Sequence, residues 1–392
     1  MELATGQFND AYTPIMDGVS MVVKNYARWL NRTLGPCCVV TPEFPGYRDR
    51  EDFPVLRYRS VPIPHRRPYR MGVPNIDIPF QIRLKRRPFH LIHCHSPFSA
   101  AGLALKIARQ RGIPLVATFH SKWKENLQRS LRMKRLVTYK MKRIVNFFNQ
   151  ADEVWSPSES AIATLREYGY HGHVEVVHNG VDMETPRGID AYRHDGNTYL
   201  ETTDKDNVLL YVGQLAWEKN LTLTLKALQR LKKKETHFKM VFVGEGYARK
   251  RLISMTRKLG LIPQVEFTGV ITDRERLKAY YGRADLFLFP SLYDTAGLVV
   301  KEAAAFKVPA LLLNGATAAE GIVDGRNGFL SDHSPEAFGR KIETLLANKT
   351  TLRRVGDEAF RTLFTPWSRV AEEVKQRYLA IAARYPSIHP TR

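Results

Sequence analysis

Short apolar runs recur along the chain, and each is followed by a polar turn and then by a segment whose apolar residues return every three or four positions. The clearest case is residues 286–315. An apolar run stops at Pro290, a helix of small and apolar residues begins near Gly297, and a second apolar run covers residues 308–313. This pattern predicts strand, loop, helix and strand, and hence an α/β fold.

The same alternation predicts further elements in both halves of the chain. Strands are expected at residues 1–8, 37–42, 89–97, 113–120, 207–213 and 239–243, and helices at 19–30, 100–110 and 368–392. Residues 183–207 are polar and lack apolar periodicity, which predicts a linker. The expected domains are therefore residues 1–182 and 208–367, and a length of 392 residues suits two domains.

The net charge of +21 is unevenly spread, because +12 of it falls within residues 1–182. Residues 122–143 contain nine Lys or Arg and one acid, and apolar residues from Met133 to Phe148 fall at helical spacing. This predicts a basic amphipathic helix. It either docks on an anionic membrane or packs its apolar stripe on the domain with its charges solvated. The candidate membrane-facing residues are Arg132, Lys134, Arg135, Lys142 and Arg143, reinforced by Arg66, Arg67, Arg70 and the basic residues of 83–87.

No apolar run reaches the length of a membrane-spanning helix, and the N-terminus lacks the pattern of a signal peptide. The three cysteines are too few for a disulfide framework. We therefore expect a protein of the cytoplasm that associates peripherally with the inner face of the membrane.

The helix near Gly297 carries the most informative chemistry. The N–H groups of Gly297, Leu298 and Val299 would face an anion at the carboxyl end of the preceding strand. Asp294 and Glu302 flank that helix start. Because a carboxylate repels a phosphate, the two acids are better suited to hold hydroxyl groups on either side of it. A diphosphate between a ribose and a second sugar, as in a sugar nucleotide, fits this arrangement.

The spacing D-x7-E with G-L-V between its acids resembles the E-x7-E signature of the retaining glycosyltransferases of family four. Two more motifs support the resemblance, G-Q-x4-K at residues 213–219 and H-N-G-V-D at 178–182. The resemblance implies the GT-B fold, in which two Rossmann-like domains face each other across a cleft. It also implies that the C-terminal helix, residues 368–392, crosses back to the first domain.

The resemblance also implies roles for individual residues. Glu302 would bind the ribose hydroxyls, Asp294 the donor sugar and Lys219 the diphosphate. In the first domain, Gly18 would lie beside the donor phosphates, and His120, at the end of a strand, would point at the donor sugar. Asp294, Lys219 and His120 are thus the candidate catalytic residues.

Three positions depart from the family pattern. Gln214 stands where arginine is usual, which removes a positive charge from the site of the leaving group. Asp294 replaces the commoner Glu, and Ala296 replaces a larger residue, so the identity of the donor sugar is less constrained than the reaction. The G-x-G at Gly244 and Gly246 lacks the third glycine of a dinucleotide motif.

His93, Cys94 and His95 look like a metal cluster, but alternation along a strand places the two histidines on one face and the cysteine on the other. We therefore predict no metal site here, and the resemblance places His95 near the acceptor.

These features together predict a retaining glycosyltransferase that moves a hexose from a nucleotide diphosphate sugar, UDP-glucose, to a hydroxyl group, and that requires no metal or other cofactor. The resemblance to glycolipid glucosyltransferases favours a membrane lipid such as diacylglycerol as acceptor. Two alternatives stay open: a GT-B enzyme acting on soluble sugars, and a catalytically silent basic protein that binds membrane or nucleic acid. The presence of Lys219, Asp294 and Glu302 favours an enzyme, and nucleic acid is not the expected partner.

Overall fold

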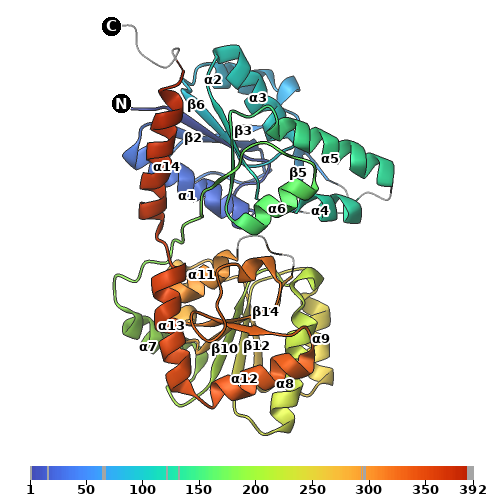
Figure 1. The fold of residues 1–392 in the computed structure, drawn as a ribbon, viewed down its shortest axis with the longest axis vertical. Helices are drawn as coiled ribbons and strands as arrows, with labels where there is room; N and C mark the ends of the chain where they lie inside the picture. Colours follow the sequence, from blue (N-terminus) through green and yellow to red (C-terminus); the bar gives the residue numbers. More distant parts are fainter. Residues whose placement is uncertain are drawn as a thin grey trace. The chain divides into compact units, whose positions relative to one another are not determined.

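The computed structural model describes residues 2–15, 17–63, 68–120, 122–130, 133–292, 294 and 297–385. The chain divides into two compact units. Unit 1 comprises Met1–Gly180 and Trp367–Arg392, and unit 2 comprises Val181–Pro366. In Figure 1 unit 1 contains the elements coloured from blue to the green of α6, together with the last helix, α14.

Unit 1 is built on a parallel sheet with the strand order β3-β2-β1-β6-β7-β8-β9, accompanied by a small antiparallel hairpin, β4-β5. The strands are β1 Thr5–Phe8, β2 Cys37–Pro42, β3 Val55–Tyr58, β4 Ser60–Pro62, β5 Arg70–Gly72, β6 Leu91–Cys94, β7 Leu115–Thr118, β8 Glu153–Ser156 and β9 Glu175–Val176. All residues of β1, β2, β6 and β7 are buried, as expected for a parallel sheet covered on both faces.

The helices of unit 1 are α1 Gly18–Thr33, α2 Ile78–Lys85, α3 Ser99–Arg111, α4 Trp123–Ser130, α5 Lys134–Phe148, α6 Glu159–Glu167 and α14 Trp367–Ala382, with a 3-10 turn η1 at Pro74–Ile76. The C-terminal helix α14 packs beside α1, as predicted (Figure 1). The Trp367 and Tyr26 rings meet edge to face at 5.3 Å. Residues 386–392 of the predicted helix lie outside the described residues.

Unit 2 is built on a second parallel sheet, with the order β12-β11-β10-β13-β14-β15. Its strands are β10 Val208–Val212, β11 Lys239–Val243, β12 Val265–Gly269, β13 Leu286–Phe289, β14 Ala310–Leu313 and β15 Phe329–Ser331. Its helices are α7 Ile189–Leu200, α8 Leu221–Lys233, α9 Arg249–Lys258, α10 Arg274–Arg283, α11 Leu298–Ala305, α12 Pro335–Leu346 and α13 Lys349–Leu363, with 3-10 turns η2 Trp217–Lys219 and η3 Thr317–Ala319. The predicted strand, loop, helix and strand of residues 286–315 are thus confirmed.

Each sheet has one point at which the strand order reverses, because the chain adds strands first toward one edge of the sheet and then toward the other. In unit 1 this point lies between β1 and β6, and in unit 2 between β10 and β13. The loops that follow two such neighbouring strands diverge to opposite faces and leave a crevice at the carboxyl edge, where α/β proteins bind ligands. Two crevices of the same kind are therefore available, one in each unit.

The predicted linker, residues 183–207, is wrong, because this segment folds as part of unit 2. Helix α7 packs on α10, and Gly196 permits the close approach, since a Cβ at that position would lie 2.2 Å from the carbonyl oxygen of Ala279. The buried residues of α7 are Tyr192, Gly196 and Leu200, spaced four apart. That spacing defines an apolar stripe too narrow to stand out in a polar sequence.

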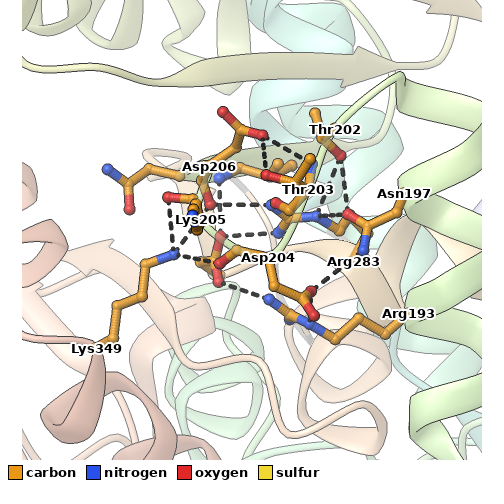
Figure 2. A network of polar contacts seen from close by, with 12 residues as sticks. Arg193, Asn197, Thr202, Thr203, Asp204, Lys205, Asp206, Arg283 and Lys349 are labelled. Atoms are coloured by element: carbon orange, nitrogen blue, oxygen red, sulfur yellow. Dashed lines mark hydrogen bonds and ion pairs between the residues drawn. The ribbon is translucent and has the colours of Figure 1, made fainter.

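The loop after α7 is held by two cations (Figure 2). The fully buried Arg283 donates to Asp285 Oδ2 at 2.9 Å and to the carbonyl oxygens of Thr203 and Asp206 at 2.7 and 2.9 Å. Lys349 Nζ donates to the carbonyl oxygens of Asp204 and Asp206, at 3.0 Å each. These bonds satisfy backbone groups that a flexible linker would leave to water.

The structure shows where the apolar residues of the predicted basic helix, α5, lie. Its apolar stripe is buried in unit 1 through Val137, Met141, Ile144, Phe147 and Phe148. From Val137 onward the stripe therefore packs on the domain, whereas Met133, at the N-cap of the helix, is 65% exposed. Among the candidate membrane-facing residues, Lys134, Arg135, Lys142 and Arg143 are exposed, whereas Arg132 lies outside the described residues, as do Arg66 and Arg67. Within the part of the chain that the structure describes, none of the helices combines the length and hydropathy needed to cross a membrane.

Candidate active site

The crevice of unit 2 begins with two loops that pack backbone to backbone. A Cβ on Gly244 would lie 2.0 Å from the carbonyl oxygen of Gly213, and one on Gly246 would lie 2.3 Å from that of Leu215. Leu215 N donates to the carbonyl oxygen of Glu245 at 2.9 Å. The glycines of the G-x-G therefore fix the loop after β11 against the loop after β10.

The side chains of Lys219 and Asp294 meet between β10 and β13, where the strand order of unit 2 reverses. Lys219 ends the turn η2 after β10, Asp294 follows β13, and Lys219 Nζ donates to Asp294 Oδ1 at 2.5 Å. Asp294 Oδ2 is buried and, among the described residues, has no hydrogen-bond partner. A buried carboxylate oxygen without a donor is costly, so this atom is suited to accept a hydrogen bond from a ligand hydroxyl.

Helix α11 presents its N-terminus at the same edge. Gly297 caps it in the left-handed conformation, with φ 51°. A Cβ there would lie 3.2 Å from the Cβ of Ala318, so both the backbone angle and the space require glycine. No side chain of the described residues caps this helix. The N–H groups of Leu298 and Val299, with the positive end of the helix dipole, are suited to bind an anion.

Glu302, one turn along α11, is half-buried, and Tyr281 Oη donates to its Oε2 at 2.7 Å. Burial raises the pKa of Glu302, against lowering contributions from the charge of Arg274 and from the Tyr281 hydrogen bond. Tyr281, which the sequence did not single out, thus orients the carboxylate and leaves Oε1 as the second acceptor oxygen. Asp294 and Glu302 flank the helix start, as their spacing predicts.

Gln214 lies in the loop after β10 with an exposed side chain. The hydroxyl of Tyr211, a buried residue, donates to the backbone carbonyl oxygen of Gln214 at 3.0 Å and fixes the loop. Ala296 lies outside the described residues. Unit 2 thus brings Gln214, Lys219, Asp294, Glu302 and the first residues of α11 to one sheet edge.

Gly18 and His120 belong to unit 1. Gly18 is exposed at the first position of α1, and the helix start is capped by Asp17, whose Oδ1 accepts from Ser20 N at 2.8 Å. His120 follows β7 and is buried. It pairs with His95, with 3.0 Å between His120 Nε2 and His95 Nδ1. Their predicted roles toward donor and acceptor remain predictions.

The histidines of β6 and β7 form a buried polar chain. His93 Nδ1 lies 2.5 Å from Tyr378 Oη of α14, and His95 Nε2 lies 2.9 Å from Gln7 Oε1. Burial lowers the pKa of His93 and His95 well below the usual value, and lowers that of His120 to about 3. Three neutral imidazoles therefore lie buried side by side in the interior of unit 1.

The rings of His93 and His95 are 4.0 Å apart, whereas Cys94 Sγ donates to the carbonyl oxygen of Ser96 at 3.2 Å. This agrees with the alternation predicted for the strand. In the described part of the chain, no group of three or more His, Cys, Asp or Glu is placed to hold a metal ion.

The sequence reasoning missed Asp10, which fills the anion position of unit 1. Asp10 follows β1, and its Oδ1 accepts from Ala100 N at 3.0 Å, in the first turn of α3. Ser99 Oγ also donates to Oδ1, and Asp10 Oδ2 accepts from Ser96 Oγ at 2.6 Å. Burial raises the pKa of Asp10 despite these hydrogen bonds. The chain itself thus supplies the carboxylate that occupies the start of α3.

Comparison with known proteins agrees with the division of the chain into two units. The model described as "Glycosyltransferase Family 4" matches residues 16–185, and that described as "Glycosyl transferases group 1" matches residues 199–362. A curated relative, alpha-monoglucosyldiacylglycerol synthase of Streptococcus pneumoniae, is 25% identical over 346 residues, which cover 87% of this chain and 78% of the relative.

Two solved structures share the fold along nearly the whole chain. Sucrose-phosphate synthase from Thermosynechococcus elongatus superposes with a TM-score of 0.79 at 18% identity, covering 98% of this chain and 100% of that one. Anabaena HepE in complex with UDP-glucose gives a TM-score of 0.75 at 16% identity, covering 97% and 100%. The chain therefore belongs to glycosyltransferase family four. It is an enzyme with the GT-B fold, as its motifs predicted.

Proposed function

We propose that this glycosyltransferase moves glucose from UDP-glucose to a hydroxyl group of a membrane lipid such as diacylglycerol, and that it retains the configuration of the anomeric carbon. The lipid acceptor is supported by the pneumococcal relative, whose name specifies a glucosylated diacylglycerol. The donor is supported by the HepE structure, which holds UDP-glucose on the same fold.

The observation that carries the proposal is Asp294 Oδ2 beside Lys219, a buried atom for which the described residues offer no hydrogen-bond partner. An ammonium group has three donors, so Lys219 keeps two for diphosphate oxygens while one holds Asp294 in place. Asp294 Oδ2 would then accept from a hydroxyl of the donor sugar. Glu302, on the other side of the helix start, would accept from the ribose hydroxyls.

The chemistry then depends on charge at the leaving group. The acceptor oxygen forms a bond to the anomeric carbon on the same face from which the bond to the phosphate oxygen breaks. The acceptor's proton passes to the departing phosphate. Lys219 and the N–H groups of Leu298 and Val299 stabilise the negative charge that develops on the diphosphate, which is the largest contribution that a fixed site can make. The proposal therefore includes no metal ion.

Unit 1 is proposed to bring the enzyme to its acceptor. The exposed charges of α5, Lys134, Arg135, Lys142 and Arg143, would attract an anionic bilayer. Each basic group near such a surface contributes about 1 kcal/mol, and added salt weakens the attraction. Association with the inner face of the cytoplasmic membrane follows from this proposal.

The test offers the purified enzyme UDP-glucose, GDP-mannose and ADP-glucose, each with diacylglycerol in mixed micelles or with a soluble sugar as acceptor. We expect UDP release and labelled glucolipid from UDP-glucose and diacylglycerol alone, unchanged by EDTA. The coupling constant of the product's anomeric proton should report the α configuration of the donor. Transfer from another donor, transfer to the soluble sugar only, inversion or loss of activity in EDTA would each overturn the corresponding part of the proposal.

A further inference from the structure

Helix α2 has apolar residues on two opposite faces. Phe80 and Leu84 are buried against unit 1. Ile78 and Ile82 lie four residues apart on the outward side and are 70% and 49% exposed, and Ile76 in the turn before the helix is 70% exposed. A surface helix normally turns polar residues outward, and single exposed apolar residues need no explanation. Three exposed isoleucines within one short segment do require an explanation.

The surroundings of these isoleucines are basic. Arg83 and Lys85 are exposed on the same helix, and Arg86 is exposed at its C-cap. Residues 53–120 contain twelve Lys or Arg and a single acid, Asp77. Asp77 is buried, and its carboxylate accepts from Phe80 N at 3.2 Å and from Arg59 N at 2.8 Å. Its charge is therefore used to cap α2, and no carboxylate of this stretch faces solvent.

We propose that this surface, which we call the α2 surface and define as Ile76, Ile78, Ile82, Arg83, Lys85 and Arg86, is the part of the enzyme that enters an anionic bilayer. The isoleucines would lie at the boundary between headgroups and acyl chains, and the three cations at the headgroups. The inference rests on the proposed lipid acceptor and deepens it by naming the apolar contact.

Helix α5 exposes less aliphatic surface than the α2 surface does. A stably bound peripheral protein combines charge attraction with buried apolar area. The apolar stripe of α5 from Val137 to Phe148 is buried in unit 1, and the apolar residues that this helix exposes beside its charges are Leu136, 36%, and Tyr139, 56%. The α2 surface supplies both within a single segment.

Aliphatic side chains also distinguish a bilayer from a nucleic acid as the partner. Surfaces that bind single-stranded nucleic acid stack bases on aromatic rings beside their cations. The exposed apolar residues of η1 and α2 are all isoleucines, which offer no ring for stacking and fit acyl chains.

The first experiment compares flotation with vesicles of pure phosphatidylcholine and of phosphatidylcholine with phosphatidylglycerol. The test variant is Ile76→Ser/Ile78→Ser/Ile82→Ser. The matched control is Ile262→Ser/Val270→Ser/Val323→Ser, which changes three aliphatic residues of similar exposure, 50%, 54% and 52%, in unit 2. We expect the test variant to lose binding to anionic vesicles by roughly 10-fold or more, from the apolar area removed, and the control to bind like the parent. Parental binding by the test variant, or an equal loss in the control, would overturn the proposal.

The second experiment reports contact directly. All three native cysteines are buried, so an Ile78→Cys variant can be labelled at one site with an environment-sensitive dye, and Ile262→Cys serves as the control. We expect a blue shift at position 78 on adding anionic vesicles and none at position 262. A response at 78 to an oligonucleotide but not to vesicles would instead assign the surface to nucleic acid.

Failure of this inference is distinguishable from failure of the proposed function. Diacylglycerol dispersed in detergent needs no docking, so the triple Ile→Ser variant should glucosylate it at the parental rate while losing activity on vesicles. If the parent enzyme itself leaves dispersed diacylglycerol unmodified, the proposed acceptor is wrong whatever the vesicles show. If the variant stays fully active on vesicles, only the α2 surface is wrong.

Discussion

The crevices of the two units have the same topology and opposite contents. In unit 1 the start of α3 is filled by Asp10, which takes the hydrogen bonds of Ala100, Ser96 and Ser99. In unit 2 no side chain of the described residues caps α11, and the neighbouring loop contributes the cation Lys219. The start of α3 thus binds a carboxylate of the chain itself, whereas the start of α11 is suited to bind an external anion.

The comparison shows that the position of a crevice in the sheet does not decide whether it binds a phosphate. A buried carboxylate at a helix start satisfies the N–H groups and repels a further anion, whereas a lysine at that edge attracts one. The loop after the central strand of each sheet makes this difference, through Asp10 after β1 and Lys219 after β10. The predictions below test it.

The largest effect is expected from Lys219→Ala. Loss of the ammonium group removes the principal cation from the departing diphosphate, and kcat/KM for UDP-glucose should fall by roughly 10²-fold or more. The control is Lys349→Ala, which removes a lysine bound to backbone carbonyl groups before β10 and should leave kcat/KM near the parental value. Steady-state kinetics of UDP release measure both, and an unaffected Lys219→Ala would show that another residue holds the leaving group.

The Glu302→Gln substitution should weaken the binding of UDP-glucose by about 1.5–3 kcal/mol, the usual contribution of a hydrogen bond to a charged group, and leave the fold intact. Isothermal calorimetry measures the loss. A variant that binds as tightly as the parent would contradict the assignment of Glu302 to the ribose.

The raised pKa of Glu302 gives this prediction a pH dependence. The carboxylate is the form that accepts hydrogen bonds with both oxygens, and it is lost as pH falls through the raised pKa. Affinity for UDP-glucose should therefore fall on acidification sooner than an ordinary glutamate would allow. The decline should be absent in Glu302→Gln.

Lowering the pH should also destabilise unit 1 more than unit 2. The pKa of His120 is lowered to about 3 in the folded state, so its contribution to stability is complete above the unfolded value near 6.5 and is lost as pH falls below it. From pH 7 to pH 5 this residue alone should lower the stability of unit 1 by about 2 kcal/mol, with further loss from His93 and His95.

The histidines of unit 2, His194, His237 and His333, are exposed and serve as the internal comparison. Hydrogen exchange followed by mass spectrometry reads the two units separately. Equal acid sensitivity of both units would contradict the buried, neutral state of the histidine chain.

The smallest effect is expected from Gln214→Arg. An exposed cation at this position would restore a charge near the diphosphate, and exposed ion pairs contribute roughly 0.2–1 kcal/mol. UDP affinity should rise by a few-fold at low salt and return toward the parental value at high salt. Weaker binding would place Gln214 away from the phosphates.

Much of unit 2 was predictable because its strands are continuous apolar runs and its helix start is marked by Gly297. The partnership of Lys219 with Asp294 was implied only by family resemblance, since the two residues are far apart in sequence and meet because β10 pairs with β13. Asp10 gave no local signal at all. Its role depends on the pairing of β1 with β6, which brings its loop to the start of α3.

Two errors of interpretation have physical causes. Helix α7 was taken for a linker because a buried stripe of Tyr192, Gly196 and Leu200 contains a glycine, whose use is the close approach to α10. The apolar stripe of α5 was detected correctly, but periodicity alone does not tell whether such a stripe faces a protein core or a bilayer. The exposed isoleucines of α2 escaped notice because prolines interrupt the pattern there.

The most direct test of the central claim follows backbone amide resonances while UDP-glucose is added to isotopically labelled protein. The account predicts that the amide signals of Leu298 and Val299 shift with a saturable dependence on the nucleotide sugar. That of Ala100, whose N–H is already held by Asp10, should stay in place. Movement of Ala100 with Leu298 and Val299 unchanged would assign the donor to unit 1 and contradict the account.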